Sequence, residues 1–352
     1  MEIEERKKRR AGAFWIMAVA AFLIAVLMTT VGTASISFGD ALKIVLSALP
    51  HIGDYVDISG IKASHVAIIK NIRLPRIIIS ALVGMALSIS GAVLQGIFKN
   101  PMADPYVLGV SSGAAFGATL SIALGISFEF AGLSSTGVFA FVGAIGATMT
   151  VYGLSIKNNK ADMTSLLLAG IAINFFLSSL ISLIMTFNRE QVEKIIFWTM
   201  GSVSAASWNQ VAISLPLITA GCLLAMFFSR ELNVMLMGDE TASSLGVDVP
   251  RTRGILLVLA SVVSAAAVSV SGIIGFVGLV IPHVVRIFAG PDHRTLMPLA
   301  IISGAIFMML ADMLARTLAS PSEIPIGVIT AMLGAPYFIY LLNSTKNSIF
   351  KR

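Results

Sequence analysis

The stretch "RLPRIIISALVGMALSISGAVLQG", residues Arg73–Gly96, decides the fold class. After Arg76 it contains no charged residue, and a helix needs about 20 apolar residues to cross the hydrocarbon of a bilayer. It is also rich in glycine, alanine and serine, which let helices pack closely where lipid provides no hydrophobic drive for association. The stretch therefore predicts a membrane-spanning helix that touches its neighbours closely.

The composition extends this prediction to the whole chain. Of 352 residues, 57% are hydrophobic and 12% are charged, whereas about 25% are charged in soluble proteins. We predict an all-α polytopic membrane protein, with one transmembrane domain over residues 1–352, because helix-length apolar runs leave no alternating pattern for a barrel. The ten predicted spans lie near residues 12–32, 74–97, 106–125, 134–156, 163–187, 208–229, 254–271, 273–289, 296–317 and 325–342.

Two of these spans have an alternative. The basic stretch "MEIEERKKRR" followed by an apolar run suits a signal peptide, but the run is longer than the usual 7–15 residues. We expect an uncleaved first helix, with a cleaved signal peptide as the alternative. The eighth run is short and contains Pro282, so a broken or re-entrant helix near Gly272–Gly278 is the alternative there.

The basic residues indicate the orientation. Ten spans place both termini on one side, and assigning that side to the cytoplasm puts sixteen Lys and Arg inside and eight outside. This agrees with the positive-inside rule. We expect a multi-pass protein of the cytoplasmic membrane with both termini in the cytoplasm, and we attribute the net charge of +6 to these loops rather than to nucleic-acid binding.

The sequence lacks the motifs of common chemistry. It has no G-x-x-x-x-G-K-[ST] phosphate loop, no Ser-His-Asp or H-E-x-x-H arrangement, and four histidines without ligand spacing. We therefore assign no catalytic, cofactor or metal residue. The spans carry no chain of Asp, Glu and His for proton coupling. Asp312 and Arg316 are spaced to face each other, either as a structural bridge or as part of a pathway.

One predicted cytoplasmic segment, residues 230–253, is too patterned for a simple connector. Leu232 and Met235 share a helical face, and we predict two short amphipathic helices at the inner surface. A helix resting on lipid carries a Lys/Arg-rich polar face. This segment carries Asp239 and Glu240 instead, which favours a protein partner, with a lipid surface as the alternative.

Two other polar features remain. Arg73, Arg76 and Arg316 lie near the predicted outer ends of their helices, where guanidiniums suit the carboxylates of a docking protein or anchor the helices by snorkelling. The stretch "GIFKNPMADPYVLG", residues 96–109, has two prolines that forbid a continuous helix. We interpret it as a cytoplasmic turn facing water, in which Asp104 caps the following helix.

Six stretches together resemble a known family: "RLPRIIISALVGMALSISGAVLQGIFKNPMADPYVLGVSSGA", "TSLLLAGIAIN", "WTMGS", "GDETASSLGVDV", "SGIIGFVGLVIPHVVRIFAGPDHR" and "EIPIGVITAMLGAPYFIYLL". The chain is similar to the permease subunit of type II ABC importers for iron-siderophores, haem and cobalamin. The resemblance implies ten helices per subunit, a homodimer with a pathway between the copies, two ATP-binding cassette ATPase subunits, and an extracellular or periplasmic substrate-binding protein.

The resemblance also implies roles for particular residues. Arg73, Arg76 and Arg316 would dock the binding protein. The cytoplasmic gate would include Met163, Thr164 and Ser165. Contacts with the ATPase would come from Gly238, Asp239, Glu240, Ala242, Leu245 and Gly246.

The implied function is alternating access without chemistry in this chain and without a cofactor. An ion-coupled secondary transporter and a membrane anchor that transports nothing are the alternatives. The sequence does not decide which chelate is carried.

Overall fold

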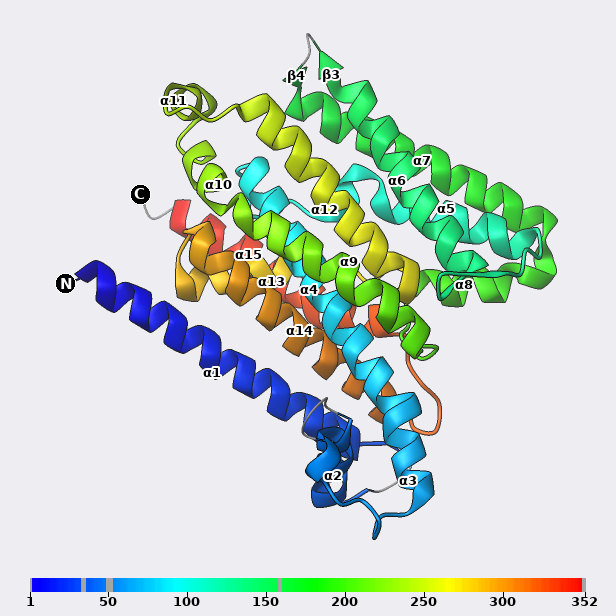
Figure 1. Ribbon diagram of the computed structural model, residues 1–352. Helices are drawn as coiled ribbons and strands as arrows, with labels where there is room; N and C mark the ends of the chain where they lie inside the picture. Colours follow the sequence, from blue (N-terminus) through cyan, green and yellow to red (C-terminus); the bar gives the residue numbers. More distant parts are fainter. Residues whose placement is uncertain (1, 33–35, 49–52, 158–159, 350–352) are drawn as a thin grey trace.

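The computed structural model describes residues 2–32, 36–48, 53–157 and 160–349, and nearly all of them are helical (Figure 1). In the described residues, seven helices are long and apolar enough to cross a membrane, and three more are apolar but shorter. The expectation of an all-α membrane protein is confirmed. The long helices are α1 (Glu2–Thr30), α4 (Leu74–Ile97), α6 (Ser135–Ser155), α7 (Met163–Phe187), α9 (Trp208–Phe227), α12 (Val249–Ser271) and α14 (His293–Thr317).

Shorter elements connect these helices. The three shorter apolar helices are α5 (Val110–Ala123), α13 (Val277–Ala289) and α15 (Ile326–Ile349), the last apolar to Leu341. The remaining helices are α2 (Phe38–Ser47), α3 (Ala63–Ile68), α8 (Val192–Thr199), α10 (Ser229–Met235) and α11 (Asp239–Ser244), with 3₁₀ turns η1 (Gly53–Tyr55), η3 (Pro105–Leu108) and η4 (Arg189–Gln191). Two small antiparallel hairpins pair β1 (Glu129–Phe130) with β2 (Leu133–Ser134) and β3 (Ile156–Lys157) with β4 (Lys160–Ala161).

Helix α4 is the centre of the bundle. It packs against α9, α12, α13 and α14, and most of its residues are buried. Gly91 is needed where α4 crosses α13, because an added Cβ would overlap the Gly278 carbonyl oxygen. Gly84 meets Gly304 of α14 in the same way. The small residues of this helix therefore permit two backbone-to-backbone crossings.

The helix containing α4 begins earlier than residue 74, because α3 and a π-helical turn (Ile69–Arg73) run directly into it. Pro75 has no N–H, and the Leu74 N–H bonds the carbonyl five residues back, at Ile69. The Lys70 carbonyl oxygen consequently lacks a donor from its own helix. It accepts a hydrogen bond from Trp208 Nε1 at 2.8 Å, which ties α9 to this turn.

The turn after α4 differs from the sequence interpretation. Its first residues are exposed, but Ala103, Pro105 and Leu108 are buried, and η3 contacts α4, α5, α6, α7 and α12. The predicted turn therefore faces water only in its first residues, and the prediction is wrong for residues 103–108. The helix after it starts at Val110, since Gly109 is left-handed with φ 82° and separates η3 from α5.

A second irregular segment lies at residues 272–276, between α12 and α13. The Tyr106 hydroxyl joins the two irregular segments: it donates to the Ile274 carbonyl at 2.8 Å and accepts from the Ile274 N–H at 3.1 Å. Non-helical backbone within a membrane protein is tolerated where protein surrounds it and its polar groups are paired. One side chain thus satisfies both backbone groups of Ile274.

Pro282 creates another such need in α13, because it cannot donate to the Gly278 carbonyl oxygen one turn earlier. Gln95 of α4 supplies donors instead. Its Nε2 lies 3.1 Å from the Leu279 oxygen and 3.4 Å from the Gly278 oxygen. The polar Gln95, at 2% exposure, is therefore explained by the proline on the neighbouring helix.

The bundle has two distinct ends (Figure 1). We call the end that carries α10 and α11 the α11 end. The opposite end carries α2, α3, α8 and residues 318–325. The sites described below lie at these two ends.

Candidate functional site

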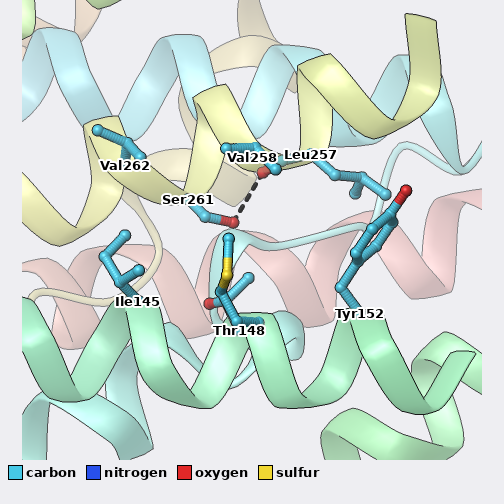
Figure 2. Close-up of a pocket in the computed structure, with 8 residues that line it drawn as sticks. Ile145, Thr148, Tyr152, Leu257, Val258, Ser261 and Val262 are labelled. Carbon is cyan, nitrogen blue, oxygen red and sulfur yellow. Dashed lines mark hydrogen bonds between the residues drawn. The ribbon is translucent and has the colours of Figure 1, made fainter. Parts of the chain in front are cut away.

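A pocket lies between α6 and α12 (Figure 2). Ile145, Thr148 and Tyr152 face Leu257 and Ser261 across a cavity of about 60 Å³. The Ser261 hydroxyl is turned back to the Leu257 carbonyl at 2.7 Å. Sites for organic ligands usually measure about 300–1,000 Å³ and have polar groups aimed inward. This pocket is too small and too apolar to be the candidate site.

The segment at the α11 end is amphipathic. Leu232 and Met235 of α10 and Ala242 of α11 are completely buried, whereas Met237 and Leu245 are 65% and 63% exposed. The buried side chains hold the segment on the bundle. The exposed ones leave an apolar surface pointing away from it.

Asp239 fixes α11 to two other parts of the chain. Its carboxylate lies 2.9 Å from Lys99 Nζ, in the turn after α4, and 2.8 Å from Arg253 Nη2, on α12. Burial raises the pKa of the Asp239 carboxyl, but the hydrogen bonds and charges of Arg253 and Lys99 outweigh this, and the net pKa is below its usual value. The carboxylate is therefore charged at neutral pH and clamps α11 to α4 and α12.

A second joint connects α10 to α14. The Asn233 amide donates to Asp292 Oδ1 at 2.7 Å and accepts from the His293 N–H at 2.8 Å. His293 Nδ1 lies 2.9 Å from the same Asn233 oxygen, which assigns the proton of the neutral imidazole to Nδ1. Asn233 thereby helps to cap the first turn of α14.

The structure divides the six residues predicted to contact an ATPase into three groups. Gly238 and Gly246 bound α11 with φ of 113° and 85°. Asp239 and Ala242 face the bundle, as described above. Glu240 and Leu245 are exposed.

The joints at the α11 end include residues that sequence reasoning missed: Lys99, Asn233, Arg253 and His293. They lie far apart in the sequence, and no local pattern marks them. Only the positive φ of 50° at Lys99 makes one of them locally unusual, and that too needs the structure.

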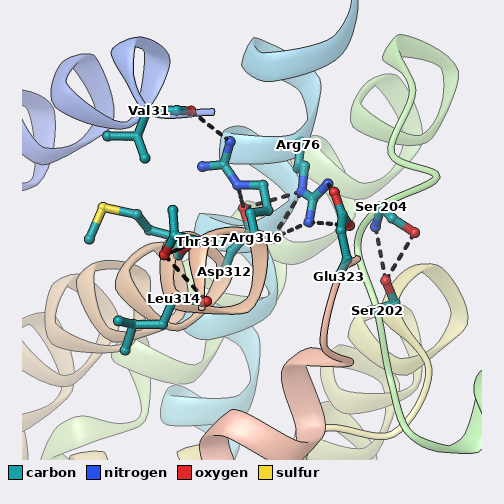
Figure 3. A network of polar contacts seen from close by, with 10 residues as sticks. Val31, Arg76, Ser202, Ser204, Asp312, Leu314, Arg316, Thr317 and Glu323 are labelled. Carbon is teal, nitrogen blue, oxygen red and sulfur yellow. Dashed lines mark hydrogen bonds and ion pairs between the residues drawn. The ribbon is translucent and has the colours of Figure 1, made fainter. Parts of the chain in front are cut away.

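The three predicted docking arginines lie near one another at the opposite end, and their side chains are buried. Figure 3 shows two of them, Arg76 and Arg316, on either side of Asp312. Arg76 lies 2.9 Å from Asp312 and 2.9 Å from Glu323. Arg316 Nε lies 3.2 Å from Asp312 Oδ2, so the expected pair one turn apart is present. Glu323 was missed because it follows α14 in a loop.

Two of these arginines also contact backbone at the end of α1. Arg73 Nη1 donates to the Thr29 carbonyl oxygen, and Arg316 Nη1 donates to the Val31 carbonyl oxygen at 3.3 Å. The arginines therefore tie α1, α4 and α14 together. Their role in docking a partner stays a prediction.

The three predicted gate residues begin α7. Met163 is half-buried against the main core and Thr164 is exposed. The Ser165 N–H donates to Asp162 Oδ2 at 2.7 Å, which caps the helix. The first turn of α7 is thus capped by Asp162, and the gate assignment stays a prediction.

Comparison with known proteins agrees with this architecture. The model of the FecCD transport family matches residues 17–344. The chain is 46% identical over 283 residues to the cobalamin import system permease protein BtuC of Halobacterium salinarum, covering 80% of this chain and 75% of that one. It is 42% identical over 275 residues to the hemin transport system permease protein HmuU of Yersinia pestis, covering 77% and 82%.

Two further similarities cover nearly the whole chain. The Fe(3+)-citrate import system permease protein YfmD of Bacillus subtilis is 34% identical over 344 residues, which is 97% of this chain and 98% of that one. A solved metal-chelate type ABC transporter in an inward-facing conformation superimposes with a TM-score of 0.82 at 30% identity, covering 95% of this chain and 99% of that one. This chain therefore belongs to the FecCD transport family and is a non-catalytic, membrane-spanning permease subunit of an ABC importer.

Proposed function

We propose that this permease works as a homodimer that moves a metal chelate across the cytoplasmic membrane by alternating access. The single observation that carries the proposal is the clamped segment at the α11 end. Asp239 joins α11 to α4 and α12, and Asn233 joins α10 to α14. A displacement of the exposed Leu245 by a partner would therefore be transmitted to α4, α12 and α14, which form the bundle core.

The orientation follows from this role. The α11 end faces the cytoplasm, where the two ATP-binding cassette ATPase subunits bind Glu240 and Leu245. The opposite end, with Arg73, Arg76 and Arg316, faces the substrate-binding protein. The excess of lysine and arginine in the loops assigned to the cytoplasm supports this placement.

The second copy covers α7 in this proposal. Of the seven long helices, α7 is the least buried in the single chain. Ser178, Ser182 and Thr186 are exposed along it, and the last two donate to carbonyls of their own helix. A hollow of about 570 Å³ lies at the end of α7, lined by Ala123, Thr186, Phe187, Asn188, Arg189, Glu190 and Gln191. The same helix exposes large apolar side chains, among them Leu168, Phe175 and Phe187. A second copy would bury these apolar side chains, and the line of hydroxyls beside the hollow would border the pathway between the two copies.

The proposed cargo is a bulky chelate: an iron-siderophore, haem or cobalamin. The similar proteins described above are importers for cobalamin, hemin and ferric citrate. The pathway needs to bind this cargo only weakly, because a ligand shifts the equilibrium between two conformations only through its different affinity for each.

The test is uptake into liposomes that contain the permease and its ATPase, supplied with candidate binding proteins loaded with each of the three chelates. Uptake should require ATP and one binding protein. Uptake driven by an ion gradient without the ATPase would instead establish the secondary transporter, and a complex that moves none of the chelates would favour a membrane anchor.

A matched pair of variants tests the surface for the ATPase. Leu245→Arg should abolish co-purification of the ATPase, because it places a charge in an apolar contact. Leu318→Arg changes a side chain of similar exposure, 64% against 63%, at the opposite end and should leave the complex intact. Equal effects of the two variants would contradict the assignment of the α11 end.

A further inference from the structure

Arg76 binds two carboxylates at once, and they are held in different ways. Its Nε lies 3.0 Å from Asp312 Oδ1, while Nη1 and Nη2 form a two-pronged contact with Glu323, at 2.9 Å to Oε1 and 3.0 Å to Oε2 (Figure 3). The outer edge of the guanidinium is thus filled by Glu323. A fork-to-fork pair of this kind is the geometry in which arginine binds carboxylates most specifically.

The two carboxylates differ in burial and support. Asp312 lies within α14, its side chain is 0% exposed, and it also pairs with Arg316. The Glu323 side chain is 43% exposed, and it lies in the exposed connection between α14 and α15. Removing Asp312 would leave buried arginines uncompensated. The part-exposed Glu323 carboxylate can exchange Arg76 for water, because Arg76 then keeps Asp312 as its partner.

The fork of Arg76 can accept an added carboxylate only when Glu323 leaves it. Arg73, Arg76 and Arg316 carry three positive charges against two negative charges on Asp312 and Glu323. A third carboxylate at Arg76 would be repelled by Asp312 and Glu323, which already bind the same guanidinium. With Glu323 displaced, the same carboxylate would enter an already formed fork.

We propose that Glu323 is an internal placeholder for a carboxylate of the docking binding protein, which takes its position on Arg76. This inference rests on the proposed function, since it requires the arginine end to receive a protein partner. The proposal assigns to Glu323 a role in weakening docking. Neither the arginine motif nor the similarity to other permeases assigns a role to this residue.

Displacement of Glu323 also has a structural consequence. The connection is held at its far end by the Ile324 N–H, which donates to the Ala315 carbonyl at 3.0 Å. Glu323 makes an ion pair between this connection and Arg76 of α4. When it leaves Arg76, this contact with α4 is lost while the backbone hydrogen bond of Ile324 to α14 stays. Docking would thereby loosen the link between α14 and α15 on the side where the partner binds.

The test measures the affinity of the permease–ATPase complex, in nanodiscs, for the binding protein that supports uptake by the wild type. Glu323→Gln removes the competing charge and should tighten docking about fivefold, which corresponds to about 1 kcal/mol for one part-exposed ion pair. Glu323→Asp keeps the charge but shortens its reach, and it should tighten docking less. The matched control is Glu129→Gln, which removes an exposed carboxylate at the same end that bonds Asn209 rather than an arginine.

A second arm tests whether the effect passes through Arg76. In an Arg76→Gln background, Glu323→Gln should no longer change the affinity. The placeholder role of Glu323 would be refuted if Glu323→Gln alone left docking unchanged or weakened it. Equal tightening by Glu129→Gln would also refute it. If no binding protein docks on the wild-type complex, the proposed function itself fails, and this result is distinct from the others.

Discussion

The change Tyr106→Phe removes one oxygen atom, and the structure predicts a large loss of stability from it. That oxygen is the partner of both backbone groups of Ile274, at 2.8 Å and 3.1 Å. Ile274 is 1% exposed, so water does not replace the lost contacts without rearrangement. The shape of the ring is unchanged, and the cost arises from unpaired polar groups rather than from a cavity.

The magnitude follows from the two groups. Each buried backbone group left without a partner costs about 1–3 kcal/mol. Two such groups give about 2–6 kcal/mol, and local movement of the irregular segment 272–276 lowers this sum. We expect a loss of about 3 kcal/mol in the free energy of unfolding.

The assay is denaturant or thermal unfolding of the purified permease in detergent. The variant keeps the aromatic ring and its packing, so the assay reports only the loss of the hydroxyl. Tyr152→Phe is the matched control, because the Tyr152 hydroxyl has no hydrogen bond among those found in the described part of the chain. A Tyr106→Phe variant as stable as Tyr152→Phe would refute the view that this hydroxyl holds the two irregular segments together.

Three further predictions concern other polar contacts. Asp239→Asn should lower uptake per ATP hydrolysed without loss of folding, because two part-exposed ion pairs together contribute only about 1 kcal/mol. Asp54→Asn, the same change at an exposed aspartate of η1 at the opposite end, should retain the wild-type ratio, and equal losses would contradict the clamp. Gln95→Leu should cost about 1–3 kcal/mol in unfolding experiments because two carbonyls of α13 lose their donor, and wild-type stability would refute this. Burial raises the pKa of Asp104 to about 6 from 3.8, although a hydrogen bond from the Tyr106 N–H opposes the rise. The folded state therefore binds the proton more tightly, and stability should fall as pH rises from about 4 to 6. Asp104→Asn, which keeps the cap acceptor, should remove this slope, and an unchanged slope would assign it to another group.

Sequence reasoning predicted the fold class because the bilayer imposes a length and a composition on each span. Helix α4 illustrates this: an uncharged run with many small residues has few alternatives in lipid. Reasoning from the sequence alone did not foresee that residues 103–109 turn inward. Pro101 and Pro105 exclude a continuous helix, but whether water or protein satisfies the backbone depends on α12 and on Ile274, which lie far along the chain.

The same division applies to the two ends. Composition and spacing by themselves determined a membrane-embedded bundle of about ten apolar helices and one internal ion pair, Asp312 with Arg316, because periodicity and i,i+4 spacing are local properties. Only the tertiary structure decided that Asp239 meets Lys99 and Arg253, and that Glu323 occupies Arg76. These contacts join residues up to 247 positions apart, and the energy of an ion pair depends on the distance between charges in space rather than along the chain.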